Sequence, residues 1–300
     1  MIMKNFRNIA HLFAGLSLLV GATTLSAENL PAVADVNGKL DYSGGSLNGT
    51  DGHNFSGSIT LPIGEQFGFQ GDALYSRISD FDFYGSGGHL FWRDPEIGLL
   101  GLAGGYLDRT GVDTYQVGAE GEYYLDRFTF GFFGGIASIN YDTAVPFIDT
   151  NPTEFIGKIS VGYYPLDNLL VRASYTTSFG DGLAKAEVEY QTPVRGLALT
   201  AEGAQGDHNY DHWLLGVRYY FGGKKSLRDR HRQDDPPGLM PQILHGLGVY
   251  GAEFNRKGNR FLRAHAGPGN YGSYYGFSSI DSILIGSVPH IPIGSVTYVP

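Results

Sequence analysis

The chain has 300 residues and a formal net charge of −9, and its composition excludes several classes of protein. It contains no cysteine, which excludes a disulfide framework and thiol chemistry. No apolar run reaches the roughly 18 residues that a membrane-spanning helix needs, so a helical membrane protein is excluded as well. The 45 glycines, 20 tyrosines and 19 phenylalanines instead favour strands and tight turns.

The N-terminal residues have the three parts of a secretory signal peptide. Lys4 and Arg7 form a basic start, Ile9–Ala22 is an apolar block, and small residues follow. The sequence at 25–27 is a suitable cleavage site, with a later alternative at 32–34. We therefore expect a signal peptide at 1–27 and a mature protein that lies outside the cytoplasm.

Twelve runs with the two-residue period of a β-strand follow between about Val36 and Phe221. Short connections at 64–66, 94–96, 126–127, 165–168 and 193–195 alternate with longer ones at 43–53, 77–85, 108–113, 140–152, 179–182 and 205–211. Bacterial outer-membrane barrels have short periplasmic turns, longer external loops and an even number of strands. The sequence therefore predicts an all-β fold, a transmembrane antiparallel up-and-down β-barrel of about 12 strands over 35–221, with 10 or 14 strands left open.

Each predicted strand has one apolar and one polar face. In the strand at 114–125, Tyr115, Val117 and Tyr123 share one face, while Glu120 and Glu122 share the other. The period alone does not distinguish a lipid-facing surface from a soluble core, but aromatic residues near the strand ends favour lipid. The predicted lumen-lining residues are Lys39, Asp41, Asp72, His89, Arg93, Glu120, Glu122, Lys158, Arg172, Lys185, Glu187, Glu189, Glu202 and Arg218.

Two predicted strands, at 98–107 and 128–138, do not alternate. Both are apolar on both faces and rich in glycine, which lets backbones approach closely or a sheet bend. A membrane barrel accommodates such strands only where the lumen wall is apolar or the lumen is plugged.

The last predicted strand has the form of a barrel-closing strand. Its alternating apolar residues are Trp213, Leu215, Val217, Tyr219 and Phe221. Outer-membrane barrels usually end on such a phenylalanine, which the barrel-assembly machinery reads, but 79 residues follow Phe221 in this 300-residue chain. We interpret 222–238 as a charged, disordered periplasmic linker, because it combines many charges with two prolines. Residues 239–300 are rich in glycine, tyrosine and serine and are interpreted as a flexible tail without an assigned domain.

Four stretches of the chain resemble a known family. These are "GHLFWRDPEIGLLG" at 88–101, "VGAEGEYYLDRFTF" at 117–130, "YYPLDNL" at 163–169 and "KSLRDRHRQDDPP" at 225–237. They are similar to proteobacterial outer-membrane β-barrel proteins of porin-like appearance and unassigned function. The resemblance covers roughly 35–238 and implies the barrel and an outer-membrane location. It implies no catalytic residues.

The sequence offers few candidates for catalysis or metal binding. The cluster "GDHNYDH" at 206–212 contains His208 and His212 and would suit an Asp–His pair or a weak metal site, but we interpret it as a solvated loop. His89 is interpreted as a pore-lining residue, since local spacing brings no serine or carboxylate to it. The sequence therefore predicts no enzyme, no cofactor and no metal centre.

The charge distribution favours transport of small cations or other solutes. Between Glu28 and Phe221 there are 25 acidic and 10 basic residues, whereas Gly222 to Pro300 holds 5 acidic and 9 basic residues. An acidic water-filled barrel would favour cations. We expect a small porin-like channel with mild cation preference, with outer-membrane lipid as its surroundings and no nucleic-acid partner. The alternatives are a structural or adhesion-type barrel with a filled lumen and, third, an outer-membrane hydrolase.

Overall fold

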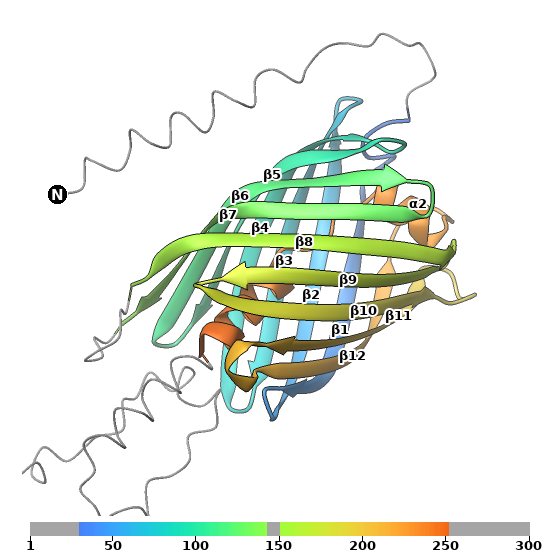
Figure 1. Ribbon diagram of the computed structural model, residues 1–300. Helices are drawn as coiled ribbons and strands as arrows, with labels where there is room; N and C mark the ends of the chain where they lie inside the picture. Colours follow the sequence, from blue (N-terminus) through green and yellow to red (C-terminus); the bar gives the residue numbers. More distant parts are fainter. Residues whose placement is uncertain (1–29, 143–150, 252–300) are drawn as a thin grey trace, which may run out of the picture.

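The computed structural model describes residues 30–142 and 151–251, and within them twelve antiparallel strands form a closed barrel (Figure 1). Every strand pairs with its neighbours in the sequence, and β1 pairs with β12 to close the ring. The predicted up-and-down fold and the predicted count of twelve are confirmed. The strands are β1 (Asn37–Leu47), β2 (Thr50–Ile63), β3 (Phe67–Ile78), β4 (Phe81–Asp94), β5 (Gly98–Arg109), β6 (Val112–Leu125), β7 (Phe128–Tyr141), β8 (Thr153–Leu166), β9 (Leu169–Ser178), β10 (Asp181–Gln191), β11 (Leu197–Gly206) and β12 (Asp211–Tyr220).

Most connections that the sequence predicts as longer loops are two-residue turns in the structure. Between β1 and β2 the turn is Asn48 and Gly49, with φ angles of 52° and 80°, which suit the tight hairpin turns that Asn-Gly forms. The connections between β3 and β4, β5 and β6, and β9 and β10 are equally short. The prediction failed because the strands continue beyond their apolar part into polar and glycine-rich sequence, which resembles a loop. The signal peptide and residues 143–150 lie outside the described residues.

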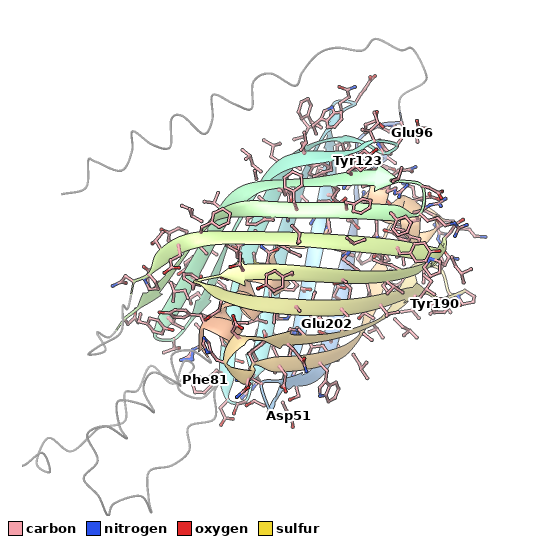
Figure 2. All side chains as sticks on the ribbon, viewed as in Figure 1. Asp51, Phe81, Glu96, Tyr123, Tyr190 and Glu202 are labelled. Atoms are coloured by element: carbon pink, nitrogen blue, oxygen red, sulfur yellow. The ribbon has the colours of Figure 1, made fainter. Side chains whose placement is uncertain are left out.

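The outer surface of the barrel is apolar. Ile59, Leu215 and Tyr123 are 62%, 60% and 55% exposed, and Figure 2 shows side chains such as Tyr123 and Tyr190 standing on the outside of the ribbon. A surface of this extent is unsuited to water, and aromatic rings within it suit the two membrane interfaces. The predicted closing strand follows the same rule, because Trp213, Leu215, Val217, Tyr219 and Phe221 are all exposed. The fold is therefore that of a bacterial outer-membrane β-barrel. Among the described residues, no helix is long and apolar enough to cross a membrane.

The stretch at 222–238, predicted to be a disordered linker, contains a helix and turns back to the barrel. Ser226 caps the N-terminus of helix α2 (Leu227–Gln233), because its hydroxyl accepts a hydrogen bond from the Asp229 N–H at 3.2 Å. Leu227 is fully buried with Tyr164 and Tyr220, beneath one mouth of the barrel. The charge of this stretch misled the prediction, because several of its charged groups have partners on the barrel.

The chain then enters the lumen, where residues 234–251 form what we call the plug. Residues 240–251 are helical and lie inside the barrel in Figure 1. Apolar side chains of the plug pack against inward-facing residues of the strands, and the members of this cluster from both the plug and the strands are buried. The plug contributes Leu239, Met240, Ile243, Leu244, Leu247 and Tyr250 to this cluster, and the strands contribute, among others, Leu74, Phe83, Leu107, Phe133 and Leu214. Residues 252–300, the remainder of the predicted tail, lie outside the described residues.

The plug accounts for the two strands that are apolar on both faces. Ala103 and Leu107 of β5 and Phe133 and Ala137 of β7 turn inward and belong to the cluster around the plug. The expectation that these strands require an apolar or plugged lumen is met by both conditions at once.

The plug runs from one mouth of the barrel to the other. The plug starts at Asp234, directly after α2, and α2 lies at the mouth formed by the turn between β8 and β9. There the N–H of Arg228 in α2 donates to the carbonyl of Asp167 in that turn. At the opposite mouth, the ring of Tyr250 lies 5.1 Å from the ring of Phe179 in the turn between β9 and β10. Residues 234–251 therefore extend through the lumen rather than closing only one end.

Candidate functional site

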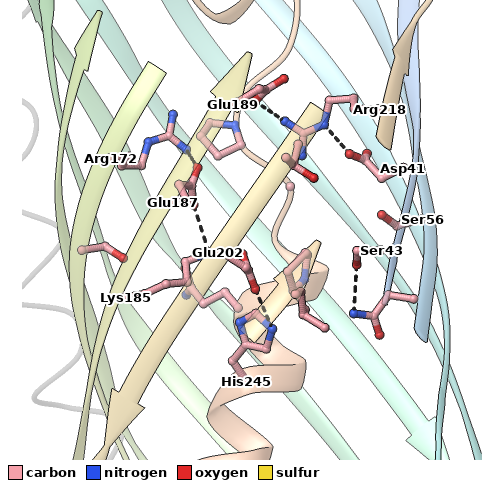
Figure 3. A pocket seen from close by; sticks show the side chains of 18 of the residues that line it. Asp41, Ser43, Ser56, Arg172, Lys185, Glu187, Glu189, Glu202, Arg218 and His245 are labelled. Atoms are coloured by element: carbon pink, nitrogen blue, oxygen red, sulfur yellow. Dashed lines mark hydrogen bonds and ion pairs between the residues drawn. The ribbon is translucent and has the colours of Figure 1, made fainter. Parts of the chain in front are cut away.

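A polar cavity of about 160 Å³ remains between the plug and the wall formed mainly by β8–β12, β1 and β2 (Figure 3). Ten of the fourteen residues predicted to line the lumen border it: Lys39, Asp41, Glu122, Lys158, Arg172, Lys185, Glu187, Glu189, Glu202 and Arg218. A second cavity of about 50 Å³, between the plug and strands β4–β8, is bordered by His89 and Glu120. The remaining two, Asp72 and Arg93, are buried where the plug begins.

Opposite charges alternate along the wall of the larger cavity. Arg218 on β12 lies between Asp41 on β1 and Glu189 on β10, with its Nη1 2.6 Å from Glu189 Oε2. Arg172 on β9 contacts Glu187 at 2.8 Å. Strand register causes this arrangement, since Asp41 is directly opposite Arg218 and Glu187 is directly opposite Arg172.

Lys185 extends this series of charges towards the plug. Its Nζ lies 3.0 Å from Glu187 Oε2 and 2.9 Å from Glu202 Oε2. The carboxylate of Glu202 in turn faces His245 on the plug, as the dashed line in Figure 3 shows. The ion pairs from Arg172 through Lys185 to Glu202 therefore form a connected series that ends on the plug, separate from the group around Arg218.

His89 occupies a separate buried site. Its Nε2 lies 2.9 Å from Asp72 Oδ2, and its Nδ1 lies 2.9 Å from Glu120 Oε1, so both ring nitrogens have carboxylate partners. These carboxylates come from β3 and β6, on either side of β4 and β5. Sequence spacing could not reveal them, because they are 17 and 31 residues away from His89.

The start of the plug is held by hydrogen bonds from the wall. Thr60 Oγ1 donates to Asp235 Oδ1 at 2.8 Å, and Lys39 Nζ donates to the carbonyl of Pro236 at 3.1 Å. Arg93 Nη1 donates to the carbonyl of Asp234 at 3.2 Å. Sequence reasoning identified Lys39 and Arg93 as inward-facing but missed Thr60 and Asp235. Only the two-residue period signals the inward position of Thr60, and nothing local indicates its partner.

The histidine-containing loop at 206–212 does not behave as one unit. His208 lies 2.8 Å from Asp181 across the opposite mouth. His212, by contrast, is the second residue of β12, faces the lumen and is 3% exposed. The interpretation of the whole cluster as a solvated loop is therefore wrong for His212, because the strand begins at Asp211 and carries the following residue inward.

His212 meets Glu202 and His245 in the lumen. Its Nε2 lies 3.2 Å from Glu202 Oε1, and Nε2 of His245 lies 3.4 Å from that same oxygen. One ligand atom from each of the three residues lies within 4.8 Å of the others. Glu202 and His212 are diagonal neighbours across the β11 and β12 pair, and the plug supplies the third group.

No protein-family model and no curated protein matches the chain. Solved structures are similar to it at low identity. A KdgM porin in complex with disordered oligogalacturonate is 11% identical, with a TM-score of 0.49, over 61% of this chain and 99% of that one. The NanC porin is 9% identical, with a TM-score of 0.49, over 60% and 98%. The outer membrane protein Omp33 of Acinetobacter baumannii is 12% identical, with a TM-score of 0.42, over 62% and 99%. These similarities concern the barrel fold alone.

Proposed function

We propose that this protein is a porin-like channel of the outer membrane whose lumen is closed by its own C-terminal plug. The observation that carries the proposal is a charged lumen wall that is covered by a separate segment of the chain, the plug. Charged and polar side chains line the larger cavity, whereas the plug is covalently connected to the barrel through the chain between Phe221 and Asp234 and otherwise touches the wall by noncovalent contacts. A lining of this kind suits a water-filled passage once the plug has left.

Two features of the plug support its being a movable element: the small number of its polar contacts and the closure of the barrel without it. Its helical residues 240–251 make an apolar contact with the wall. Its polar contacts are few: hydrogen bonds at Asp234, Asp235, Pro236 and Leu239, and the approach of His245 to Glu202. The twelve strands already satisfy one another's backbone groups around the closed ring without it. Displacement of the plug would therefore leave the barrel wall intact.

We further propose a mild preference for cations in the unplugged state. It is supported by the excess of acidic residues, 25 against 10 basic residues, between Glu28 and Phe221. The wall of the larger cavity is more nearly balanced, with Lys39, Lys158, Arg172, Lys185 and Arg218 facing a similar number of carboxylates. We therefore attribute the preference mainly to the mouths and expect it to be small.

Planar-bilayer conductance tests the channel. The full chain and a chain that ends at Phe221 are each folded and inserted, and folding is confirmed by the heat-dependent shift in electrophoretic mobility. We expect few channel openings from the full chain and steady conductance from the shortened one. In a salt gradient, the sign of the reversal potential of the shortened chain should show that cations carry more of the current than anions. If neither folded protein gives conductance above background, the proposed channel is contradicted.

That outcome would favour a structural barrel with a filled lumen. The buried apolar contact between the plug and strands β3–β7 is the observation that favours this second candidate, because it resembles a permanent core. A hydrolase is not proposed, since His208 and His212 turn to different partners.

Two partners follow from the fold and remain proposals. Outer-membrane lipid would surround the exposed apolar face, and the barrel-assembly machinery would read β12. Phe221 is 47% exposed just after β12, with its N–H donating to the Gly38 carbonyl of β1 at 2.8 Å. A closing signal in this position is expected to function even though the chain continues beyond it.

A further inference from the structure

The three groups that meet in the lumen, on Glu202, His212 and His245, lack hydrogen-bond partners on the atoms that face one another. Oε1 of Glu202, Nε2 of His212 and Nε2 of His245 are buried, and no hydrogen bond reaches any of them in the structure. His212 and His245 are each 3% exposed. Buried polar atoms normally find a partner, because leaving one unsatisfied destabilises the folded state. Three such atoms directed at one spot indicate a missing shared partner.

Two other histidines inside the barrel, buried His89 and half-buried His231, show the contrast. His89 has carboxylate partners on both nitrogens, Asp72 and Glu120. His231 of α2 has a tyrosine hydroxyl on each nitrogen, from Tyr164 and Tyr220. Both rings are satisfied by protein groups, whereas His212 and His245 each leave one buried ring nitrogen without a hydrogen bond.

The distances from the shared carboxylate oxygen to the two histidine nitrogens match the ligand shell of a metal ion. The distances from Glu202 Oε1 to Nε2 of His212 and to Nε2 of His245 are 3.2 and 3.4 Å. A tetrahedral ion with bonds of about 2.0–2.1 Å holds its ligand atoms about 3.3–3.4 Å apart. Two imidazole nitrogens and one carboxylate oxygen form a donor set that suits a divalent transition metal such as Zn²⁺.

Neighbouring groups orient two of the ligands. The Tyr210 hydroxyl lies 3.1 Å from Nδ1 of His212, so the remaining nitrogen, Nε2, is the one left for a metal. Lys185 Nζ donates to Oε2 of Glu202 at 2.9 Å, which leaves Oε1 directed at the histidines. Such supporting contacts fix ligand orientation before an ion arrives.

We propose that Glu202, His212 and His245 form a binding site for one divalent transition-metal ion, which ties the plug to the barrel wall. Glu202 and His212 belong to the wall, and His245 belongs to the plug, so the ion cross-links the two. Glu202 and His245 also border the larger cavity, from which a water molecule would complete the four-coordinate shell. The site depends on the position of the plug and not on whether the unplugged barrel conducts.

Zinc binding by the complete, tag-free chain folded in detergent tests the site. Zn²⁺ is titrated against a competing chelating dye, and Co²⁺ is substituted so that its visible absorption reports a tetrahedral nitrogen and oxygen shell. We expect one equivalent of metal and the tetrahedral Co²⁺ spectrum. His245→Gln is expected to weaken Zn²⁺ binding at least about tenfold, since it removes a direct ligand while losses at supporting groups already reach about 10–100-fold.

His208→Gln is the matched control, because His208 lies in the turn just before β12, close to His212 in the sequence, but pairs with Asp181. It is expected to bind Zn²⁺ as the unmodified chain does. His245 belongs to the plug and not to a strand, so we expect the His245→Gln variant to fold into the barrel. The heat-dependent shift in its electrophoretic mobility checks that it has folded. The proposal is overturned if the folded chain binds no equivalent of Zn²⁺, if His245→Gln binds as tightly as the unmodified chain, or if His208→Gln loses the metal equally. Conductance plays no part in these readouts, so failure of the channel and failure of the site remain distinguishable.

Discussion

Met240 of the plug packs directly against Gly105 of β5, in space that a side chain at residue 105 would fill. A Cβ atom built on Gly105 overlaps the end of the Met240 side chain and would lie 2.9 Å from Ile243 Cδ1. Gly87 of β4 is similar, since its Cβ would lie 2.7 Å from Met240 Cε. Glycines on the lumen wall thus form a recess for the plug, and this relationship can be tested by filling the recess.

Gly105→Leu is expected to displace the plug while leaving the barrel closed. Leucine is too large for Met240 to accommodate by moving its flexible end, whereas Gly105→Ala should be tolerated. Hydrogen exchange of residues 239–251, followed by mass spectrometry, measures plug opening. We expect exchange in the leucine variant to approach that of an unpacked helix. Gly203→Leu is the control, because Gly203 faces outward on β11 with only one atom, the His212 carbonyl oxygen, within 4 Å of its Cβ position. Equal protection in both variants would contradict the packing.

The hydrogen bond from Thr60 to Asp235 is expected to hold the start of the plug. Both side chains are buried, and a hydrogen bond to a charged group contributes about 1.5–3 kcal/mol. Thr60→Val should therefore accelerate exchange of the plug amides about tenfold or more. Thr177→Val provides a comparison, since Thr177 faces outward on β9. Additive effects of Thr60→Val and Asp235→Ala in a double-mutant cycle would show that the bond does not couple the two residues.

His89→Leu is expected to destabilise the barrel by about 3 kcal/mol, because it leaves the buried carboxylates of Asp72 and Glu120 without their shared partner. The measurement is urea unfolding in lipid vesicles, followed through the fluorescence of Trp92 and Trp213. His53→Leu is the matched control, since His53 is exposed on the outer face of β2. A loss no larger at His89 than at His53 would show that the carboxylates are satisfied by other groups.

Acidification is expected to strengthen the attachment of α2 through Asp234. Burial raises the pKa of the Asp234 carboxyl, and the hydrogen bond from Lys225, at 2.5 Å, offsets this only in part. A raised carboxyl pKa means that the folded state favours the protonated form. Stability therefore increases as the pH falls through the folded pKa, and the gain is complete below the unfolded value.

Hydrogen exchange of residues 227–233, measured between pH 7 and pH 4 and corrected for the intrinsic rate, reports this change. Asp234→Asn should remove the dependence and resemble the acidified protein at neutral pH. Protection that falls steadily with acidification in the unmodified chain would contradict the sign.

The sequence by itself determined the barrel, because strand geometry is local. Side chains alternate across a strand with a period of two, so the face of Glu187, Arg172 or Tyr123 can be read from the neighbouring residues alone. The even number of strands and the apolar strands at 98–107 and 128–138 also pointed to an outer-membrane barrel with an apolar or plugged lumen.

Only the tertiary structure decided what fills that lumen and which charges meet there. Asp235 reaches Thr60 across a sequence separation of 175 residues, and His245 joins Glu202 and His212 only because the chain turns back after α2. No local period encodes such contacts. They depend on barrel closure and strand register, and on the exclusion of water from the apolar contact of Met240, Ile243 and Leu247 with the wall. The charge at 222–238 therefore indicated a solvated linker when those residues were considered alone, and a folded return segment once the barrel supplied their partners.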